Sequence, residues 1–378
     1  MKIVQVTTDN RTQYDHHTLP APYFGTAPAG LLDGFADMPG VEVHVVSCAP
    51  VKMEAPKKLA NNIWFHQPYV PKIGWGRTLF LGCVHAVRGL MNEIQPDIVH
   101  GQGTERNCAM SAVLSGYPNV LTIHGNMRVH ATRGENRGRP YYKMAAALET
   151  FCLKRTHGVV AISSYTEELV KDLTPKTWLL PNAVDRRFFD VNPEPQAVPR
   201  ILFVGSLDER KNPLGLLRAC APMLLVGECT LTYAGQANAS SPYAQEFFKE
   251  ADELPGVELL GFIGRDELGV QFGRSTLLVL PTFEDNCPMV VLEAMAAGLP
   301  VAASRVGGVP DLITHEKDGL MFDPNHPSEM RASIEKLVKE PDTRARLGAE
   351  GRITAREHFH PKVIANEHLN IYREVLGR

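Results

Sequence analysis

Apolar and polar residues alternate along this chain in blocks that predict a repeated unit of strand, turn and helix. Short apolar runs of strand length end in polar or glycine-containing turns, and stretches with helical spacing follow most of them. In the first half, the runs that we interpret as strands are residues 1–6, 41–47, 96–103, 119–125 and 158–163. In the second half they are residues 200–207, 229–236, 257–263, 275–280 and 318–324, with a further strand beginning at residue 300. This alternation predicts an α/β protein with parallel sheets covered on both faces.

A proline-rich stretch separates the two alternating regions. Residues 190–199 hold three prolines and show no apolar periodicity, so we interpret them as a linker. A chain of 378 residues is long enough for two domains that each bury a substantial core. We therefore predict an N-terminal domain of residues 1–190 and a C-terminal domain of residues 191–360. The helical stretch 363–376 carries apolar residues at helical spacing, and it needs a partner surface.

Composition narrows the class of protein. Hydrophobic residues make up 44% and charged residues 21%, which is ordinary for a soluble globular protein, and a net charge of −3 gives no general attraction to nucleic acid or membrane. The seven cysteines are scattered among apolar neighbours without a CxxC pair, a pattern that indicates reduced thiols in a cytoplasmic enzyme. The apolar run at the N-terminus stops after Val6, which is too short for a signal peptide, and no apolar run approaches 18 residues.

The most informative stretch is residues 280–303, LPTFEDNCPMVVLEAMAAGLPVAA. It predicts the end of a buried strand, an acidic turn, a helix that Pro288 opens and Gly298 closes, and a new strand. The free backbone amides at the helix start form a natural binding place for an anion such as a phosphate. Asp285 and Glu293 flank this helix start, and carboxylates there would suit hydroxyl groups on either side of a phosphate, as in a nucleotide sugar. Alternatively, Asp285 caps the helix and Glu293 is a solvated surface residue.

Two further features of the chain lie at turns that follow predicted strands. Arg210 and Lys211 lie between a strand and a helix, where cations can neutralise a diphosphate, although a solvated turn is the ordinary interpretation. His124 ends a strand directly before Gly125, where doubly wound sheets present groups that contact ligands. A lone histidine is otherwise more often a satisfied hydrogen-bonding residue.

Two loops of the N-terminal domain are candidates for ligand contacts. Gly25 ends the long loop 7–28 before a predicted helix; it could let backbone amides approach a phosphate or sugar, or it could be a turn glycine. A basic loop follows His124, and it is either a solvated face or a clamp on an acidic acceptor. Its arginines are Arg128, Arg133, Arg137 and Arg139.

The stretch 280–303 resembles the signature of the retaining glycosyltransferases of family 4, which have the GT-B fold. That signature is an acidic residue, seven intervening residues and a Glu within LEAMA; Asp285 stands at the first position, with Glu284 one place earlier. The TIHG run 122–125 and the PNAVD turn 181–185 match further family motifs. The resemblance covers essentially the whole chain. It implies two Rossmann-like domains facing each other across a cleft, with residues 361–378 returning to the first domain as a helix.

The same resemblance implies roles for individual residues. Lys211 keeps the register of the family's lysine and, with Arg210, would stabilise the leaving diphosphate, while Ser206 stands where the family has arginine. Glu293 would hold the ribose, Asp285 or Glu284 the sugar hydroxyls, and His124 the reacting sugar. The remaining positions of the implied donor site are Gly25, Phe262, Ile263, Asn286, Cys287, Pro288, Met289 and Val290.

The function that the resemblance implies is retaining transfer of a hexose-type sugar from a nucleoside diphosphate donor, UDP by preference, to an acceptor hydroxyl. The C-terminal domain would bind the donor and the N-terminal domain the acceptor, which would be a sugar, a lipid-linked glycan or a small molecule. The sequence has no DxD motif and no clustered metal ligands, so we expect no metal or other cofactor, no nucleic acid partner and at most peripheral membrane contact. A nucleotide-sugar epimerase, a phosphorylase and a non-catalytic nucleotide-sugar binding protein are the alternatives.

Overall fold

The computed structural model describes residues 1–12, 17–132, 137–194 and 196–378. The chain divides into two compact units, and each is described by itself. The N-terminal unit consists of Met1–Ala183 and Pro361–Arg378, and the C-terminal unit of Val184–His360. The division falls inside the PNAVD turn, upstream of the boundary after residue 190 that the proline-rich linker predicted. Residues 191–194 and 196–199 have no helix or strand.

The N-terminal unit is built on a mostly parallel sheet. Its described strands run in the order β3-β4-β2-β1-β5-β6-β7-β8, and only β3 is antiparallel to its neighbour. The strands are β1 (Lys2–Val6), β2 (Glu42–Val46), β3 (Lys58–Ala60), β4 (Ile63–His66), β5 (Ile98–Gln102), β6 (Asn119–Ile123), β7 (Val159–Ala161) and β8 (Thr177–Leu179). The sequence prediction missed β3 and β4 because several prolines around this short antiparallel pair indicate a loop.

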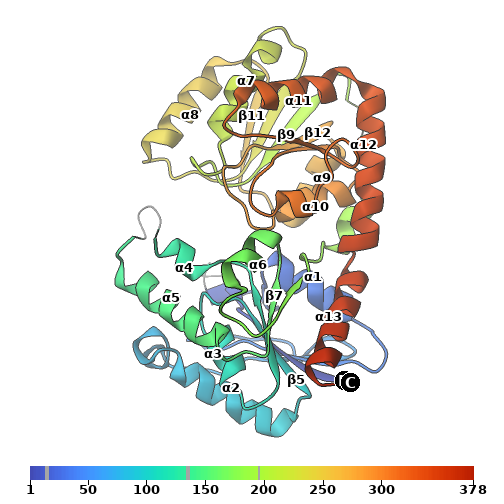
Figure 1. Ribbon diagram of the computed structural model, residues 1–378. Helices are drawn as coiled ribbons and strands as arrows, with labels where there is room; N and C mark the ends of the chain where they lie inside the picture. Colours follow the sequence, from blue (N-terminus) through green and yellow to red (C-terminus); the bar gives the residue numbers. More distant parts are fainter. Residues whose placement is uncertain (13–16, 133–136, 195) are drawn as a thin grey trace. The chain divides into compact units, whose positions relative to one another are not determined.

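Helices cover both faces of this sheet, as the alternating pattern predicted (Figure 1). One core joins the strands to α2, α3 and α5, and the other joins them to α1 and α13. The helices are α1 (Thr26–Phe35), α2 (Leu81–Ile94), α3 (Cys108–Val113), α4 (Met127–His130), α5 (Pro140–Leu153), α6 (Ser164–Val170) and α13 (Pro361–Val375). Helix α13 lies against α1 so closely that a Cβ atom on Gly34 would come within 2.1 Å of the Pro361 carbonyl oxygen. The prediction that the last helix returns to the N-terminal domain is therefore confirmed.

The C-terminal unit has a fully parallel sheet within the described residues. Its strand order is β11-β10-β9-β12-β13-β14, with α7, α8 and α11 contributing to one apolar core. The strands are β9 (Arg200–Val204), β10 (Thr230–Ala234), β11 (Val257–Gly261), β12 (Leu277–Leu280), β13 (Val301–Ser304) and β14 (Leu320–Phe322). The helices are α7 (Pro213–Leu225), α8 (Pro242–Glu253), α9 (Arg265–Gly273), α10 (Met289–Ala296), α11 (Pro327–Lys339) and α12 (Pro341–Thr354).

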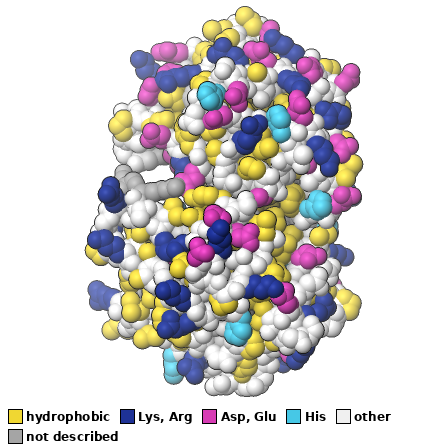
Figure 2. Space-filling model, viewed as in Figure 1, with side chains coloured by type: hydrophobic (Ala, Val, Ile, Leu, Met, Phe, Trp, Pro, Cys, Tyr) yellow, Lys and Arg dark blue, Asp and Glu magenta, His cyan; other side chains and the backbone are white. Residues whose placement is uncertain are grey.

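The mixed charges on the surface and the reduced state of the cysteines are those that the composition predicted. Figure 2 shows Lys and Arg side chains interspersed with Asp and Glu over the face that it presents. All seven cysteines are buried free thiols, so apolar packing rather than a disulfide framework holds both units together. Within the described ranges, no helix combines the length and the apolar character that crossing a lipid bilayer requires.

Candidate active site

Two turns at the carboxyl ends of neighbouring strands bring Lys211 and Asp285 together in the C-terminal unit. Strands β9 and β12 are adjacent and parallel, so the turns that follow them meet at one edge of the sheet. Lys211 Nζ forms an ion pair with Asp285 Oδ2, and the two side chains are only 14% and 15% exposed. The pair thus joins the two charged groups that the sequence analysis assigned to the diphosphate and to the sugar.

Backbone bonds fix the two turns to each other. The carbonyl oxygen of Arg210 accepts hydrogen bonds from Phe283 N at 2.8 Å and from Thr282 Oγ1 at 3.1 Å. In return, Arg210 Nη1 donates to the carbonyl oxygen of Glu284 at 3.2 Å. The guanidinium is therefore held over the acidic turn, and the half-buried Glu284 side chain lies next to Asp285 in the chain.

Asp208 shapes the turn that carries Lys211, and the sequence analysis did not single it out. Its Oδ1 accepts a hydrogen bond from Lys211 N at 2.9 Å, and its Oδ2 accepts one from Ser206 Oγ at 2.6 Å. Ser206, predicted as a donor contact, is therefore engaged inside the turn. An Asp whose side chain bonds a backbone amide a few residues later is a common turn former, so DERK could have signalled this role.

A glycine makes the close approach of a third loop possible. Gly307 has φ +54°, and a Cβ atom at this position would come within 1.8 Å of the Asp285 carbonyl oxygen. The next residue, Gly308, donates its N–H to that same oxygen at 3.0 Å. The glycine pair after β13 therefore packs directly against the backbone of the acidic turn, which explains why no side chain fits at position 307.

Glu293 is not a solvated surface residue, because its side chain is buried in the second turn of α10. The residue is 3% exposed, and its Oε1 lies 3.1 Å from Arg265 Nη1. Arg265 also approaches Asp185 Oδ2 at 3.4 Å and lies over the Phe188 ring at 5.1 Å. Burial raises the pKa of the Glu293 carboxyl, and the Arg265 guanidinium opposes part of that rise. Arg265, at the first position of α9, was missed because nothing local in the sequence links it to Glu293.

The other predicted donor residues of this unit surround the start of α10 or the end of β11. Helix α10 begins at Met289 after Pro288, so Pro288 rather than Asp285 is its N-cap residue, and Asp285 pairs with Lys211. Cys287 and Pro288 are buried, whereas Asn286, Met289 and Val290 are half-buried. Beyond β11, Phe262 is 71% exposed and Ile263 is half-buried.

In the N-terminal unit, His124 follows β6 and is half-buried at the carboxyl edge of the sheet. Burial, with a smaller contribution from His368, lowers the pKa of His124 to about 4. The imidazole is therefore neutral at physiological pH. A neutral ring can donate or accept a hydrogen bond, but it supplies no positive charge.

A buried chain of polar side chains connects His124 to helix α13. His124 Nε2 lies 3.0 Å from Gln102 Oε1, and Gln102 Nε2 donates to Gln5 Oε1 at 2.9 Å. Gln5 Nε2 in turn donates to the Tyr372 hydroxyl at 2.9 Å, and that hydroxyl lies 2.6 Å from His100 Nδ1. Parallel strand register creates this row, because it sets Gln5 beside His100 and Gln102 beside residue 122. An oxygen of Gln102 facing the ring assigns the His124 proton to Nε2.

One arginine of the basic loop after His124, Arg128, forms contacts within the N-terminal unit. Arg128 Nε lies 3.5 Å from the buried Glu149 Oε1, and its guanidinium also donates to the Leu169 carbonyl oxygen. Glu149 accepts further bonds from Thr104 Oγ1 at 2.5 Å and Met127 N at 2.9 Å. Arg128 therefore anchors α4 to α5. Of the other arginines, Arg137 and Arg139 are exposed, and Arg133 lies outside the described residues.

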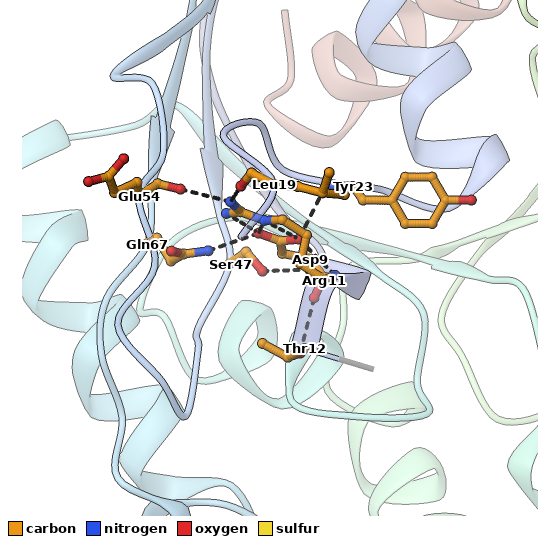
Figure 3. A network of polar contacts seen from close by, with 8 residues as sticks. All are labelled: Asp9, Arg11, Thr12, Leu19, Tyr23, Ser47, Glu54 and Gln67. Atoms are coloured by element: carbon orange, nitrogen blue, oxygen red, sulfur yellow. Dashed lines mark hydrogen bonds and ion pairs between the residues drawn. The ribbon is translucent and has the colours of Figure 1, made fainter. Parts of the chain in front are cut away.

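The loop before Gly25 is organised by a buried ion pair that sequence reasoning missed (Figure 3). Arg11 is fully buried, and its Nη2 donates to Asp9 Oδ2 at 2.7 Å. Its Nη1 donates to the carbonyl oxygens of Leu19 and Glu54, both at 2.7 Å. Gly25 itself precedes α1 with φ −59° and has room for a Cβ atom, so its backbone does not require glycine.

Over the ranges that the structure describes, no three His, Cys, Asp or Glu side chains come together in a way that could hold a metal ion.

Comparison with known proteins agrees with these two units. The family model for glycosyltransferase family 4 matches residues 30–188, and the model for glycosyl transferases group 1 matches residues 184–354. An uncharacterized glycosyltransferase of Methanocaldococcus jannaschii is 29% identical over 181 residues, which is 47% of this chain and 46% of that protein. The matches to this relative and to two further curated relatives each cover less than half of the relative's length.

Solved structures extend the likeness over the whole fold. Sucrose-phosphate synthase from Thermosynechococcus elongatus superposes with a TM-score of 0.75 at 19% identity, covering 100% of this chain and 99% of that one. HepE from Anabaena, in complex with UDP and glucose, gives 0.70 at 16% identity, covering 98% and 99%. These superpositions confirm the predicted fold of two Rossmann-like units. Because the two family models together match residues 30–354, the chain belongs to the glycosyltransferases of family 4, and it has the GT-B fold.

Proposed function

We propose that this protein is a retaining glycosyltransferase that moves a hexose-type sugar from a nucleoside diphosphate donor, with UDP preferred, to an acceptor hydroxyl. The observation that carries the proposal is the partly buried Lys211–Asp285 ion pair at the carboxyl edge of the C-terminal sheet. A cation and a carboxylate held together at this edge, beside the start of α10, suit the anionic diphosphate and the neighbouring sugar hydroxyls of a nucleotide sugar. The bound UDP and glucose of the HepE structure support the choice of donor.

Lys211 is the proposed electrostatic catalyst. As the bond between the anomeric carbon and the phosphate oxygen breaks, negative charge grows on the diphosphate, and Lys211 Nζ would stabilise it, helped by Arg210 and the α10 amides. When the diphosphate takes Lys211, Asp285 loses its partner and can accept hydrogen bonds from sugar hydroxyls. The exchange links donor binding to the exposure of the sugar-binding carboxylate.

The acceptor oxygen would attack the same face of the sugar from which the diphosphate leaves. The new bond forms between that oxygen and the anomeric carbon, and the acceptor proton passes to the departing phosphate oxygen. No protein carboxylate serves as nucleophile. Neutral His124 would hold a hydroxyl of the reacting sugar, and Glu293 would accept hydrogen bonds from the ribose in place of Arg265. Because Lys211 and Arg210 supply the positive charge, the proposed transfer is independent of a metal.

The N-terminal unit would bind the acceptor through the loops that end at Gly25 and that begin at Arg128. The exposed Arg137 and Arg139 favour an acceptor with an acidic group. We propose that the acceptor is a sugar, a lipid-linked glycan or a small molecule, and that the enzyme acts in the cytoplasm.

The test is nucleotide release from a panel of UDP, GDP and ADP sugars, with and without candidate acceptors. Release that depends on an acceptor supports transfer; conversion of the donor without an acceptor would indicate an epimerase, and binding without release a non-catalytic protein. Lys211→Ala should lower kcat by about 10²–10³-fold, as loss of a charge-stabilising group does elsewhere. The exposed Lys249→Ala is the matched control and should keep full turnover. A Lys211→Ala protein with unchanged kcat would refute this role.

A further inference from the structure

The segment between β4 and α2 exposes an unusual number of large apolar side chains. It contains two short 3₁₀ turns, η2 (Lys72–Gly74) and η3 (Gly76–Thr78). Four large apolar residues within and beside these turns are strongly exposed, and together they are called the turn surface here. They are Tyr69 at 49%, Ile73 at 67%, Leu79 at 45% and Leu81 at 54% exposure.

The backbone of this segment is tightly folded, which gathers the exposed residues. A Cβ atom on Gly82 would lie 2.6 Å from the Gly74 Cα atom, so the two glycines are in direct contact. The Trp75 indole Nε1 donates to the Val70 carbonyl oxygen at 2.9 Å, which folds the segment back on itself. Ile73 and Leu81 each neighbour one of the touching glycines in the chain, so their backbones lie close together.

Two consecutive residues of the turn surface segment have a strained backbone. Leu79 has φ 52° and ψ 37°, and Phe80 has φ 65° and ψ 14°, so two consecutive bulky residues adopt the left-handed region. This region is unfavourable for residues with a Cβ atom, and such outliers cluster at functional sites. Phe80 is buried and gains packing in return, but Leu79 is exposed. Burial in this structure does not explain why the strain is kept at Leu79.

The charge of the same stretch has one sign. Residues 55–92 contain five Lys and Arg and no Asp or Glu, although the whole chain has a net charge of −3. Lys72 lies in η2 and Arg77 in η3, and both are exposed between the apolar residues. On α2, His85 and Arg88 are exposed at helical spacing from Leu81, so the basic character continues along that face.

We propose that the turn surface is a docking site for an anionic lipid bilayer. Exposed Leu, Ile and Tyr side chains interleaved with Lys and Arg suit the boundary between lipid headgroups and acyl chains. The absence of acidic residues from positions 55–92 favours an anionic surface over a neutral one. The docking site needs no contribution from the catalytic residues.

The position of the turn surface gives docking a consequence for the reaction. The segment leaves the carboxyl end of β4, the edge at which the acceptor loops also lie, and Gln67 at its start donates to Asp9 Oδ2 at 2.8 Å. Docking would turn this edge toward the membrane and favour the lipid-linked class of acceptor. This consequence rests on the proposed function, whereas the docking itself does not.

The test is cosedimentation of the full chain with vesicles, without donor or acceptor. Wild-type protein should bind vesicles of equimolar phosphatidylglycerol and phosphatidylcholine, release with added salt, and bind phosphatidylcholine alone weakly. Ile73→Ser combined with Leu81→Ser, and separately Lys72→Glu combined with Arg77→Glu, should each lower binding about tenfold or more. Leu225→Ser combined with Val226→Ser, at 65% and 70% exposure at the C-terminal end of α7, is the control and should bind normally.

Thermal melts establish that each variant is folded before its binding is compared. Absence of vesicle binding by the wild type, or equal loss in the control, would overturn the docking site. Concentration-dependent self-association that Ile73→Ser abolishes would also overturn it, since the surface would then be a contact between two copies. Because vesicle binding and nucleotide release are measured separately, failure of one leaves the other interpretable.

Discussion

Breaking the buried Asp9–Arg11 pair should destabilise the N-terminal unit strongly. The Arg11 guanidinium is fully enclosed, and Nε and Nη2 donate to the Asp9 carboxylate at 2.7–3.2 Å (Figure 3). Asp9→Ala leaves this charge buried without a counter-ion, and such losses cost about 3–5 kcal/mol of unfolding free energy. Arg11 keeps the carbonyl oxygens of Leu19 and Glu54. We therefore expect the lower end of that range, about 3 kcal/mol.

A second variant separates the charge effect from lost packing. Asp9→Leu combined with Arg11→Met removes both charges, and replacing a buried pair by apolar groups is often neutral or better. The double variant should therefore be less destabilised than Asp9→Ala alone, by about 1 kcal/mol or more. Residual loss is expected, because Tyr23 N and Gln67 Nε2 also donate to Asp9 and lose their acceptor.

The assay is urea unfolding followed by tryptophan fluorescence. The three tryptophans, Trp64, Trp75 and Trp178, all belong to the N-terminal unit, so their signal follows that unit rather than the whole chain. Glu168→Ala, which removes an exposed partner of Lys171, is the control and should leave the midpoint unchanged. A double variant as unstable as Asp9→Ala, or an Asp9→Ala protein of wild-type stability, would refute the reasoning.

Gln102→Leu should lower kcat by about 10–100-fold, since the His124 ring loses its orienting partner, and ¹⁵N NMR should show His124 leaving the Nε2-protonated tautomer; an unchanged tautomer would contradict this. His368→Gln should make the free energy of unfolding less dependent on pH between 6.5 and 4. Burial lowers the pKa of His368 from 6.5 to about 4, so on acidification the unfolded chain takes up the proton before the folded chain does. The wild type should therefore lose about 3 kcal/mol of unfolding free energy over this range, and the variant should lose less. The exposed His315→Gln is its control, and parallel pH curves for wild type and His368→Gln would exclude the effect. Gly307→Ala should displace the Asp285 turn and cost about 1–3 kcal/mol as well as most activity, whereas Gly264→Ala, with open space around it, should be tolerated.

The features that the sequence predicted are those set by local pattern. Apolar runs that end in glycine turns located the central strands, and Pro288 and Gly298 located α10, because these signals act within a few residues. The acidic turn and Lys211 could be joined in advance only through the family resemblance, since the residues are far apart in the chain. The pairing of β9 with β12, which brings Lys211 and the acidic turn together, cannot be predicted from the sequence of either segment.

What the sequence could not predict depends on long-range partners. Glu293 looked exposed or ligand-facing, but α10 is apolar nearly all round and is buried, so its one carboxylate is buried with it. Its partner Arg265 lies on another helix, and no periodicity links the two. Likewise, Gln102 looks like an ordinary polar residue at a strand end until parallel register places it between Gln5 and His124.

The two acids of the family signature are both paired with cations in this structure, and that pairing has a thermodynamic consequence for the proposed donor. Asp285 is held by Lys211 and Glu293 by Arg265, so binding of the proposed donor would exchange a cation for a sugar or ribose hydroxyl at each carboxylate. The diphosphate compensates the first exchange, because it brings negative charge to Lys211 as Asp285 is released. A free sugar brings no such charge, and it would have to compete with Lys211 for Asp285 without compensation. The proposed arrangement would therefore favour a sugar that carries a diphosphate over a free sugar, through charge balance rather than through shape.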